Sequence, residues 1–107
     1  MTYDDRVLDA LGDRTRRTVF ARLRGGARSV NELADGLKVS RPAVSQHLRV
    51  LRAARLVTYR SEGTRRLYSV DQRGVKIMRN WLDGFWDHTL GAFKEAAERE
   101  AAKERKP

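Results

Sequence analysis

The stretch VSRPAVSQHLRVLRAARLV, residues 39–57, has a proline near its start and contains no glycine and no acidic residue. Ser40 is a suitable N-cap, and Pro42 falls in the first turn of a helix, where the backbone N–H has no intrahelical partner to lose. The apolar residues then follow at steps of four and three, which is the spacing of one narrow buried edge. This edge consists of Val44, Leu48 and Leu51. The stretch therefore predicts a helix that begins at Ser40 and has a broad polar side without negative charge.

A second helix is expected immediately before this one. Ser29 and Glu32 have the spacing of a capping box, in which each side chain satisfies a backbone N–H at the start of a helix. We expect the helix to continue through Leu33, Ala34 and Leu37. Two helices joined by so short a connection must cross at a steep angle, and this arrangement is the helix-turn-helix unit.

Two further helices are predicted ahead of this unit. The first has Val7, Leu8 and Leu11 on one side and can end at Gly12. Asp13 is a suitable N-cap for the second, which the glycine pair at positions 25 and 26 stops. The apolar side of the second helix consists of Val19, Phe20 and Leu23.

The second half of the chain predicts a hairpin and a long helix. Residues 56–70, LVTYRSEGTRRLYSV, suit two strands with a turn from Ser61 to Thr64. From Asp71 the pattern is helical, and about residues 95–107 we expect a solvated helical tail without an apolar face. The apolar positions of this helix are Val75, Met78, Leu82, Phe85, Thr89 and Phe93. Residues 1–107 thus predict a single winged helix-turn-helix domain that is mainly α with a small β-hairpin.

The positive charge is concentrated in the middle of the chain. The net charge is +9, of which residues 38–70 contribute +7 through eight basic residues and one acidic residue. The residues on either side contribute +1 each, because their basic and acidic residues nearly balance. A concentrated basic block is typical of a protein that binds a polyanion.

In a winged helix the second helix of the helix-turn-helix enters the major groove of DNA. Arg41, Ser45 and Gln46 lie near the start of this helix, where they can reach base edges, arginine reading guanine and glutamine reading adenine. Ser40, Arg49 and Arg52 are expected at the phosphate backbone, and three arginines of the hairpin are expected to reach the backbone or an adjacent minor groove. These hairpin residues are Arg60, Arg65 and Arg66. An acidic side chain on the polar side of the helix would point at phosphate, which explains why the stretch contains none.

The two histidines are expected to be structural. His47 lies beside Leu48, so a hydrogen-bonded packing role is favoured over a metal ligand or a catalytic base. His88 is expected on the surface of the last helix or at an interface.

The last helix has more aromatic and apolar residues than one small domain can cover. We expect a homodimer to bury them against the first helix, and a twofold dimer would place two recognition helices in successive major grooves. Tyr3 is expected to join this interface. The predicted interface residues are Val7, Leu8, Leu11, Trp81, Leu82, Phe85, Trp86 and Phe93.

The segment SRPAVSQHLRVLRAARLV, followed by RSEGTRRLYSV, resembles the ArsR/SmtB family of winged-helix repressors. LDALGDRTRRTVFARLRGG is also similar to the family pattern LADPTRRxIL, and the resemblance extends over about residues 4–93. It implies a homodimer formed by the first and last helices that binds an imperfect palindrome in its own or a neighbouring promoter. It also implies that Arg41, Ser45 and Gln46 contact DNA.

Many members of the family sense metals, and here the sequence departs from the pattern. The helix before the turn, NELADGL, lacks the family's cysteine, and the chain has no cysteine at all. At the family's ligand positions on the last helix stand Gln72, Gly74, Phe85 and His88, whereas zinc requires three or four ligands. WLDGFWDHTL instead resembles a metal-independent subset of the family, so no cofactor is expected.

Two alternatives to a sequence-specific dimeric repressor remain open. The basic block would also suit a nonspecific architectural nucleic-acid-binding protein, and the aromatic residues could line a pocket for an apolar effector at the dimer interface. An enzyme is not expected, because the chain lacks cysteine, has its two histidines far apart and shows no evident pair of carboxylates for acid–base chemistry. The polar start and the absence of a long apolar run predict a cytoplasmic protein with no membrane partner.

Overall fold

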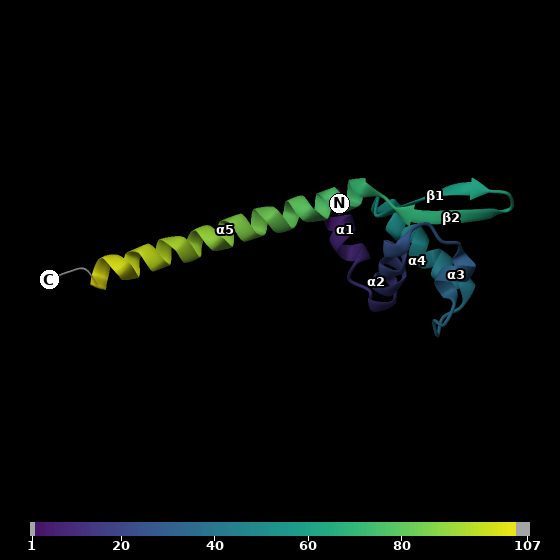
Figure 1. Cartoon of the computed structure of the whole chain (residues 1–107), viewed down its shortest axis with the longest axis horizontal. Coiled ribbons are helices and arrows are strands. Elements are labelled where there is room, and N and C mark those ends of the chain that lie inside the picture. The colour runs from purple at the N-terminus through teal and green to yellow at the C-terminus, as the bar shows by residue number, and fades with distance from the viewer. Residues whose placement is uncertain (1, 105–107) are drawn as a thin grey trace.

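A computed structural model describes residues 2–104 as a mainly helical chain with one β-hairpin, which confirms the predicted winged helix-turn-helix class. Figure 1 shows the first four α-helices and the hairpin gathered in one body, from which the last helix extends to one side. The elements in chain order are α1 (Tyr3–Ala10), α2 (Arg14–Ala21), the 3-10 helix η1 (Arg22–Gly25), α3 (Val30–Ala34), α4 (Arg41–Ala53), β1 (Val57–Glu62), β2 (Arg65–Val70) and α5 (Gln72–Glu104).

Three predicted N-caps set the starts of α2, α3 and α4. The carboxylate of Asp13 accepts from the Arg16 backbone N–H at 2.9 Å, and the hydroxyl of Ser40 accepts from the backbone N–H three residues on. Ser29 and Glu32 form the complete capping box. Backbone N–H donors favour the charged form of a carboxyl, so the Arg16 N–H lowers the pKa of Asp13 and the Ser29 N–H lowers that of Glu32.

The apolar edge of α4 lies at the centre of the core. Val44, Leu48 and Leu51 are all fully buried, and α4 contacts α1, α2, α3 and β1. Burial of each such side chain contributes about 1.5–3 kcal/mol, so this edge anchors α4 firmly in the domain. The other buried members of the core are Val7, Ala10, Val19, Leu23, Leu33, Ala54, Leu56, Val57 and Tyr68.

The hairpin is more regular than the sequence predicts. β1 and β2 pair antiparallel along their whole lengths, with Glu62 opposite Arg65 at the tip. The loop comprises only residues 63–64, because Ser61 and Glu62 belong to β1. Gly63 has a φ of 63°, and a positive φ at the first of two loop residues fits a type II′ turn, which glycine adopts without strain.

The segment between α2 and α3 is tied to the hairpin. α2 ends at Ala21, earlier than predicted, and the chain continues as η1 until the glycine pair Gly25 and Gly26 stops it. Arg28 then pairs with Tyr68 of β2, since each backbone N–H donates to the other residue's carbonyl at 2.8–2.9 Å. This bridge holds the start of α3 next to the wing.

α3 ends at Ala34, whereas the sequence predicted that it would continue through Leu37. The guanidinium of Arg22 donates to the carbonyl of Asp35, which follows the helix, and Gly36 has a φ of 76°. A side-chain donor for the end of the helix and a left-handed residue after it are common ways to stop a helix. The apolar spacing of the sequence could not predict this early end of α3, because the contact comes from Arg22 in a different element, η1.

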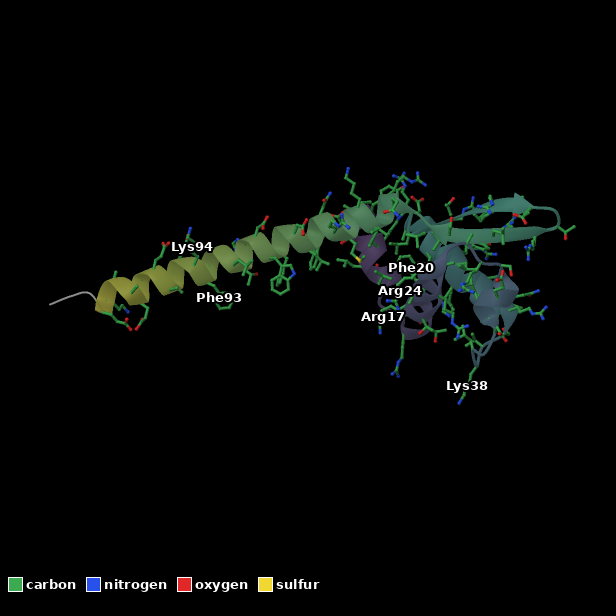
Figure 2. All side chains as sticks on the ribbon, in the orientation of Figure 1. Arg17, Phe20, Arg24, Lys38, Phe93 and Lys94 are labelled. Atoms are coloured by element: carbon green, nitrogen blue, oxygen red, sulfur yellow. The ribbon has the colours of Figure 1, made fainter. Side chains whose placement is uncertain are left out.

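α5 is a single helix of 33 residues, about 50 Å long at the usual rise per residue. It makes the molecule elongated, with extents of 77 × 26 × 25 Å, and Figure 2 shows Phe93 and Lys94 on the part that projects beyond the body. Residues 95–104 are helical and exposed, and residues 105–107 of the predicted tail lie outside the described part of the chain. Within residues 2–104, no helix is both long enough and apolar enough to span a membrane.

The first turn of α5 packs directly on the end of α4. Gly74 is buried, and its backbone N–H donates to the Arg55 carbonyl at 2.7 Å. A Cβ on Gly74 would lie 2.3 Å from that carbonyl oxygen and 2.9 Å from the carbonyl oxygen of Ala54. Arg55 itself has a φ of 59°, a left-handed conformation that costs a non-glycine residue about 1–2 kcal/mol. The junction therefore requires both a strained arginine and a glycine.

Replacement of Gly74 by alanine should lower the free energy of unfolding by about 1–3 kcal/mol, because the added methyl group meets backbone atoms that cannot move aside. Urea unfolding at one fixed protein concentration measures this change.

Gly84→Ala is the matched control, since a Cβ at Gly84 meets nothing within 4 Å. It should raise the free energy of unfolding by roughly 0.5–1 kcal/mol, the usual gain for alanine over glycine in a helix. A Gly74→Ala protein as stable as the Gly84→Ala protein would show that α5 does not approach α4 this closely.

Candidate nucleic-acid interface

The polar side of α4 is exposed, because the opposite edge is buried in the core. Arg41, Gln46, Arg49 and Arg52 are exposed, whereas Ser45 is half-buried. All five belong to one regular helix, so their relative positions are set by the backbone. The structure thus brings the predicted base-reading residues and two predicted backbone-contacting arginines onto one surface.

The N-cap Ser40 and two residues of the helix, Gln46 and Arg49, already have partners within the protein. The hydroxyl of Ser40 accepts from the backbone N–H of Ala43, as an N-cap does. The side chain of Arg49 donates to Oε1 of Gln46 at 3.0 Å. A carbonyl oxygen has two lone pairs, so Gln46 keeps one acceptor site and both amide protons for another partner.

A groove of about 520 Å³ separates α4 from the wing. Four arginines line it, two from α4 and two from β2, together with residues at the start of α3. Its lining residues are Ser29, Val30, Asn31, Ser45, Leu48, Arg49, Arg52, Thr64, Arg65, Arg66 and Tyr68. Ser45 therefore faces the groove, and the helix and the wing share one basic concave surface.

The three wing arginines are not equivalent. Arg66 stands on the hairpin face that carries Tyr68, since side chains two apart on a strand share a face. Arg60 and Arg65 lie on the other face, where each has a guanidinium nitrogen 3.7 Å from a carboxylate oxygen of Glu62. These ion pairs are exposed and contribute at most about 1 kcal/mol each, and Arg65 lines the groove as well as pairing with Glu62.

His47 is half-buried between the two sides of α4. Its Nδ1 is buried and has no hydrogen-bond partner within residues 2–104, so the expected hydrogen bond is not formed at this nitrogen. The packing role remains as predicted, with one unsatisfied ring nitrogen. His88 is exposed on α5, on the surface where it was expected.

A second surface, on α1 and α5, exposes large apolar side chains. Its exposure rises along α5 from 43% at Trp81 through 52% at Trp86 to 69% at Phe93. Phe85 stacks on Trp81 with ring centroids 5.8 Å apart and meets the edge of Trp86 at 5.4 Å. We name this surface the apolar face: Tyr3, Leu8, Trp81, Leu82, Phe85, Trp86, Leu90 and Phe93.

The apolar face differs from the predicted interface at three positions. Val7 is fully buried in the protomer's own core, so its assignment to an interface is wrong, and Leu11 is only partly exposed. Leu90 is 60% exposed and was missed by the sequence analysis. The steps of four and three from Trp86 to Leu90 and on to Phe93 are the signal that identifies it.

The family's metal positions lie on α5 without forming a cluster. Gln72 and His88 are exposed, Gly74 is buried against α4, and Phe85 is part of the apolar face. Within residues 2–104 of the protomer, no group of three or more histidine, cysteine, aspartate or glutamate side chains could hold a metal ion.

A helix-turn-helix that shares an arginine-lined groove with a β-hairpin defines a winged helix DNA-binding protein. A family model described as a helix-turn-helix domain matches residues 11–60. The HTH-type transcriptional regulator Rv2034 of Mycobacterium tuberculosis is 49% identical over 96 residues, which are 90% of this chain and 90% of that protein. The chain belongs to the ArsR/SmtB family of winged helix-turn-helix transcriptional regulators, which are DNA-binding proteins and not enzymes.

Solved structures are similar to the fold over most of the chain. An ArsR-like transcriptional regulator from Rhodococcus sp. RHA1 matches with a TM-score of 0.69 at 32% identity, over 89% of this chain and 92% of that chain. The homodimeric winged helix-turn-helix DNA-binding domain Mb0332 from Mycobacterium bovis matches with a TM-score of 0.64 at 26% identity, over 82% of each chain.

Replacement of His47 by leucine should raise the free energy of unfolding by roughly 1 kcal/mol, because it removes a buried nitrogen without a partner. Thermal or urea unfolding at pH 8, where histidine is neutral, measures the change.

Ser40→Ala, at the N-cap of the same helix, should have the opposite effect. It should lower the free energy of unfolding by about 1 kcal/mol, because the N-cap hydrogen bond is lost. Destabilisation by His47→Leu of the same size as the Ser40→Ala effect would mean that the imidazole makes a contact that stabilises the fold.

Proposed function

We propose that this protein is a dimeric repressor that binds an imperfect palindrome in its own or a neighbouring promoter. The observation that carries the proposal is the combination of a recognition helix whose polar side is free with an arginine-lined groove beside it. Such a protein works where the DNA is, so we place it in the cytoplasm. A dimer bound across a promoter would repress by occupying DNA that the transcription machinery needs.

Arg41, Ser45 and Gln46 are the proposed base-reading residues. They lie in the first half of α4, and the N-terminal residues of a recognition helix are those that meet base edges in the major groove. Arginine pairs with guanine and glutamine with adenine through two hydrogen bonds each. The Arg49 contact to Oε1 of Gln46 would hold the amide in one orientation before DNA binds.

The arginines of the groove are the proposed phosphate contacts. Arg49 and Arg52 from α4 and Arg65 and Arg66 from β2 line one concavity, which suits a DNA strand that passes between helix and wing. Ser40 and Arg60 would contact the backbone at the edges of this surface. Phosphate contacts set affinity and register and carry no base information, so these residues would position the helix that reads the sequence.

A second copy of the chain is the proposed partner of the apolar face. Leu82 to Phe93 contribute exposed rings and aliphatic groups over more than two turns of α5, and α1 adds Tyr3 and Leu8. Contiguous exposed apolar surface of this kind marks an interface in soluble proteins. A twofold axis through it would set two recognition helices about 34 Å apart, one turn of the double helix.

We further propose that repression does not require a metal ion. Gln72, Gly74 and Phe85 occupy the positions of metal ligands in relatives, and none of these residues supplies a side-chain ligand that zinc prefers. The proposed protein therefore has DNA and a second copy of itself as partners and needs no cofactor for binding.

Selection of bound fragments from random DNA should enrich one palindromic sequence, with half-sites about one helical turn apart. The enriched sequence should be the same with and without a chelator. The wild-type protein should bind it at least roughly 1,000-fold more tightly than random duplex at physiological salt. Equal affinity for both duplexes would favour a nonspecific architectural role, and release of the palindrome by added zinc would contradict the metal-free proposal.

Variants of the two residue classes separate base reading from backbone contact. Gln46→Ala or Arg41→Ala should relax the sequence preference at one position of each half-site, at a cost of about 1–3 kcal/mol on the preferred base. Arg65→Ala should instead weaken binding to all duplexes and reduce the salt dependence by about one counterion.

The single variants Phe85→Glu and Trp86→Glu should each convert the dimer to a monomer, because burial of a carboxylate in an apolar interface removes its hydration and costs free energy. Sedimentation at micromolar concentration measures the mass, and binding to the palindrome should fall with it. The matched control is Asn80→Glu, which adds the same charge on the opposite side of α5 and should leave a dimer. A monomeric wild-type protein, or dimers of both interface variants, would contradict the assignment of the apolar face.

A further inference from the structure

Tyr59 of β1 lies beneath two arginines from different elements. The guanidinium carbons of Arg52, from α4, and Arg66, from β2, are each 4.3 Å from the centre of its ring. We infer that Tyr59 is a positioning residue for DNA binding, which holds these two arginines ready for one stretch of phosphate backbone. The inference rests on the proposed DNA-binding function of the groove.

The hairpin register explains the placement. Tyr59 is directly opposite Tyr68, with ring centroids 5.4 Å apart, and Arg66 is two residues before Tyr68 on the same face. That face turns toward α4, because Tyr68 is buried in the core and lines the groove together with Leu48. Tyr59 itself is half-buried and packs against the core, so its ring has a fixed position.

Arg52 and Arg66 differ from Arg49, Arg60 and Arg65 in how they are held. Arg49 donates to Gln46, and Arg60 and Arg65 pair with Glu62. Within residues 2–104, neither Arg52 nor Arg66 has a side-chain hydrogen bond or ion pair. Both guanidinium groups are nevertheless held in place at the Tyr59 ring, because the negative face of an aromatic ring attracts a cation.

Stacking on a ring leaves the N–H donors of a guanidinium available. The attraction acts through the flat face, whereas the five N–H groups lie in the guanidinium plane and point outward. A carboxylate partner would occupy the same donors that a phosphate needs and would have to be displaced. Tyr59 therefore orders two long side chains without competing with DNA, and this removes part of the ordering cost of binding.

The contact also couples the two halves of the site. Arg52 belongs to the recognition helix and Arg66 to the wing, and both line the same groove. A single ring that contacts both keeps their separation constant, so both can meet the same DNA strand while the start of α4 reads bases. Tyr59 was not assigned from the sequence, where it suggested only strand propensity.

The test compares Tyr59→Phe and Tyr59→Leu in binding to the palindrome and to random duplex. Tyr59→Phe keeps the ring and should bind within about twofold of wild type, because the cation is attracted by the ring face. Tyr59→Leu should bind both duplexes roughly 3- to 10-fold more weakly, since the arginines must then be ordered on binding. The salt dependence of Tyr59→Leu should equal that of wild type, because both arginines still reach phosphate.

The arginine variants show whether Tyr59 acts through Arg52 and Arg66. The double variant Arg52→Ala, Arg66→Ala should lower the salt dependence by about two counterions. Adding Tyr59→Leu to this double variant should produce no further loss of affinity. Arg24→Ala is the matched arginine control: this residue is exposed on η1, outside the groove, and its removal should leave the affinity for both duplexes unchanged.

A spectroscopic measurement keeps the inference testable if Tyr59→Leu does not fold. In the wild-type protein without DNA, the side-chain protons of Arg52 and Arg66 should show upfield ring-current shifts, and Tyr59→Phe should retain them. Absence of these shifts would overturn the inference. So would equal losses of affinity for Tyr59→Phe and Tyr59→Leu, or a further loss in the background without the two arginines.

These outcomes are separate from a failure of the proposed function. Phosphate contacts do not depend on sequence, so the Tyr59 comparison can be made on random duplex alone. Equal binding of palindrome and random DNA by the wild-type protein would refute sequence-specific repression and leave the role of Tyr59 to be judged on its own measurements.

Discussion

The burial of one narrow edge of α4 is the constraint on which the rest of the molecule depends. Val44, Leu48 and Leu51 are fully enclosed by α1, α2, α3 and the hairpin, so the helix cannot rotate about its axis without exposing them. The opposite side is consequently presented to solvent in one orientation. This packing sets the direction in which every proposed DNA contact on α4 points. It also sets the position of α4 relative to the wing, and therefore the groove between them.

Charge is organised around that orientation. Residues 38–70 carry eight basic residues and one acidic residue, and the acidic residue, Glu62, lies at the tip of the wing between Arg60 and Arg65. The acidic caps Asp13 and Glu32 accept backbone N–H groups at helix starts. Negative charge near the groove is therefore either absent or already paired. The aromatic contact at Tyr59 holds positive charge in place without adding a competing anion.

α5 links the DNA-binding body to the apolar face. Its first turn is in backbone contact with the end of α4 at Gly74, and the next turns expose aromatic residues that the protomer does not cover. Because one rigid helix has both roles, the position of a second copy on the apolar face would set the orientation of the recognition helix directly. This arrangement requires the close approach at Gly74, since any side chain there would push α5 away from α4.

The sequence by itself determined the local features, because they depend on neighbours in the chain. The N-caps at Asp13, Ser29 and Ser40, the buried edge of α4 and the hairpin all follow from short spacings. Only the tertiary structure decided which side chains meet across elements: α3 stops early at an Arg22 contact, Val7 is core, and Tyr59 lies beneath Arg52 and Arg66. These contacts join residues far apart in sequence, and no periodicity encodes the distance between two packed elements. For the same reason the sequence indicated an excess of apolar residues on α5 but did not place Leu90 among those that remain exposed.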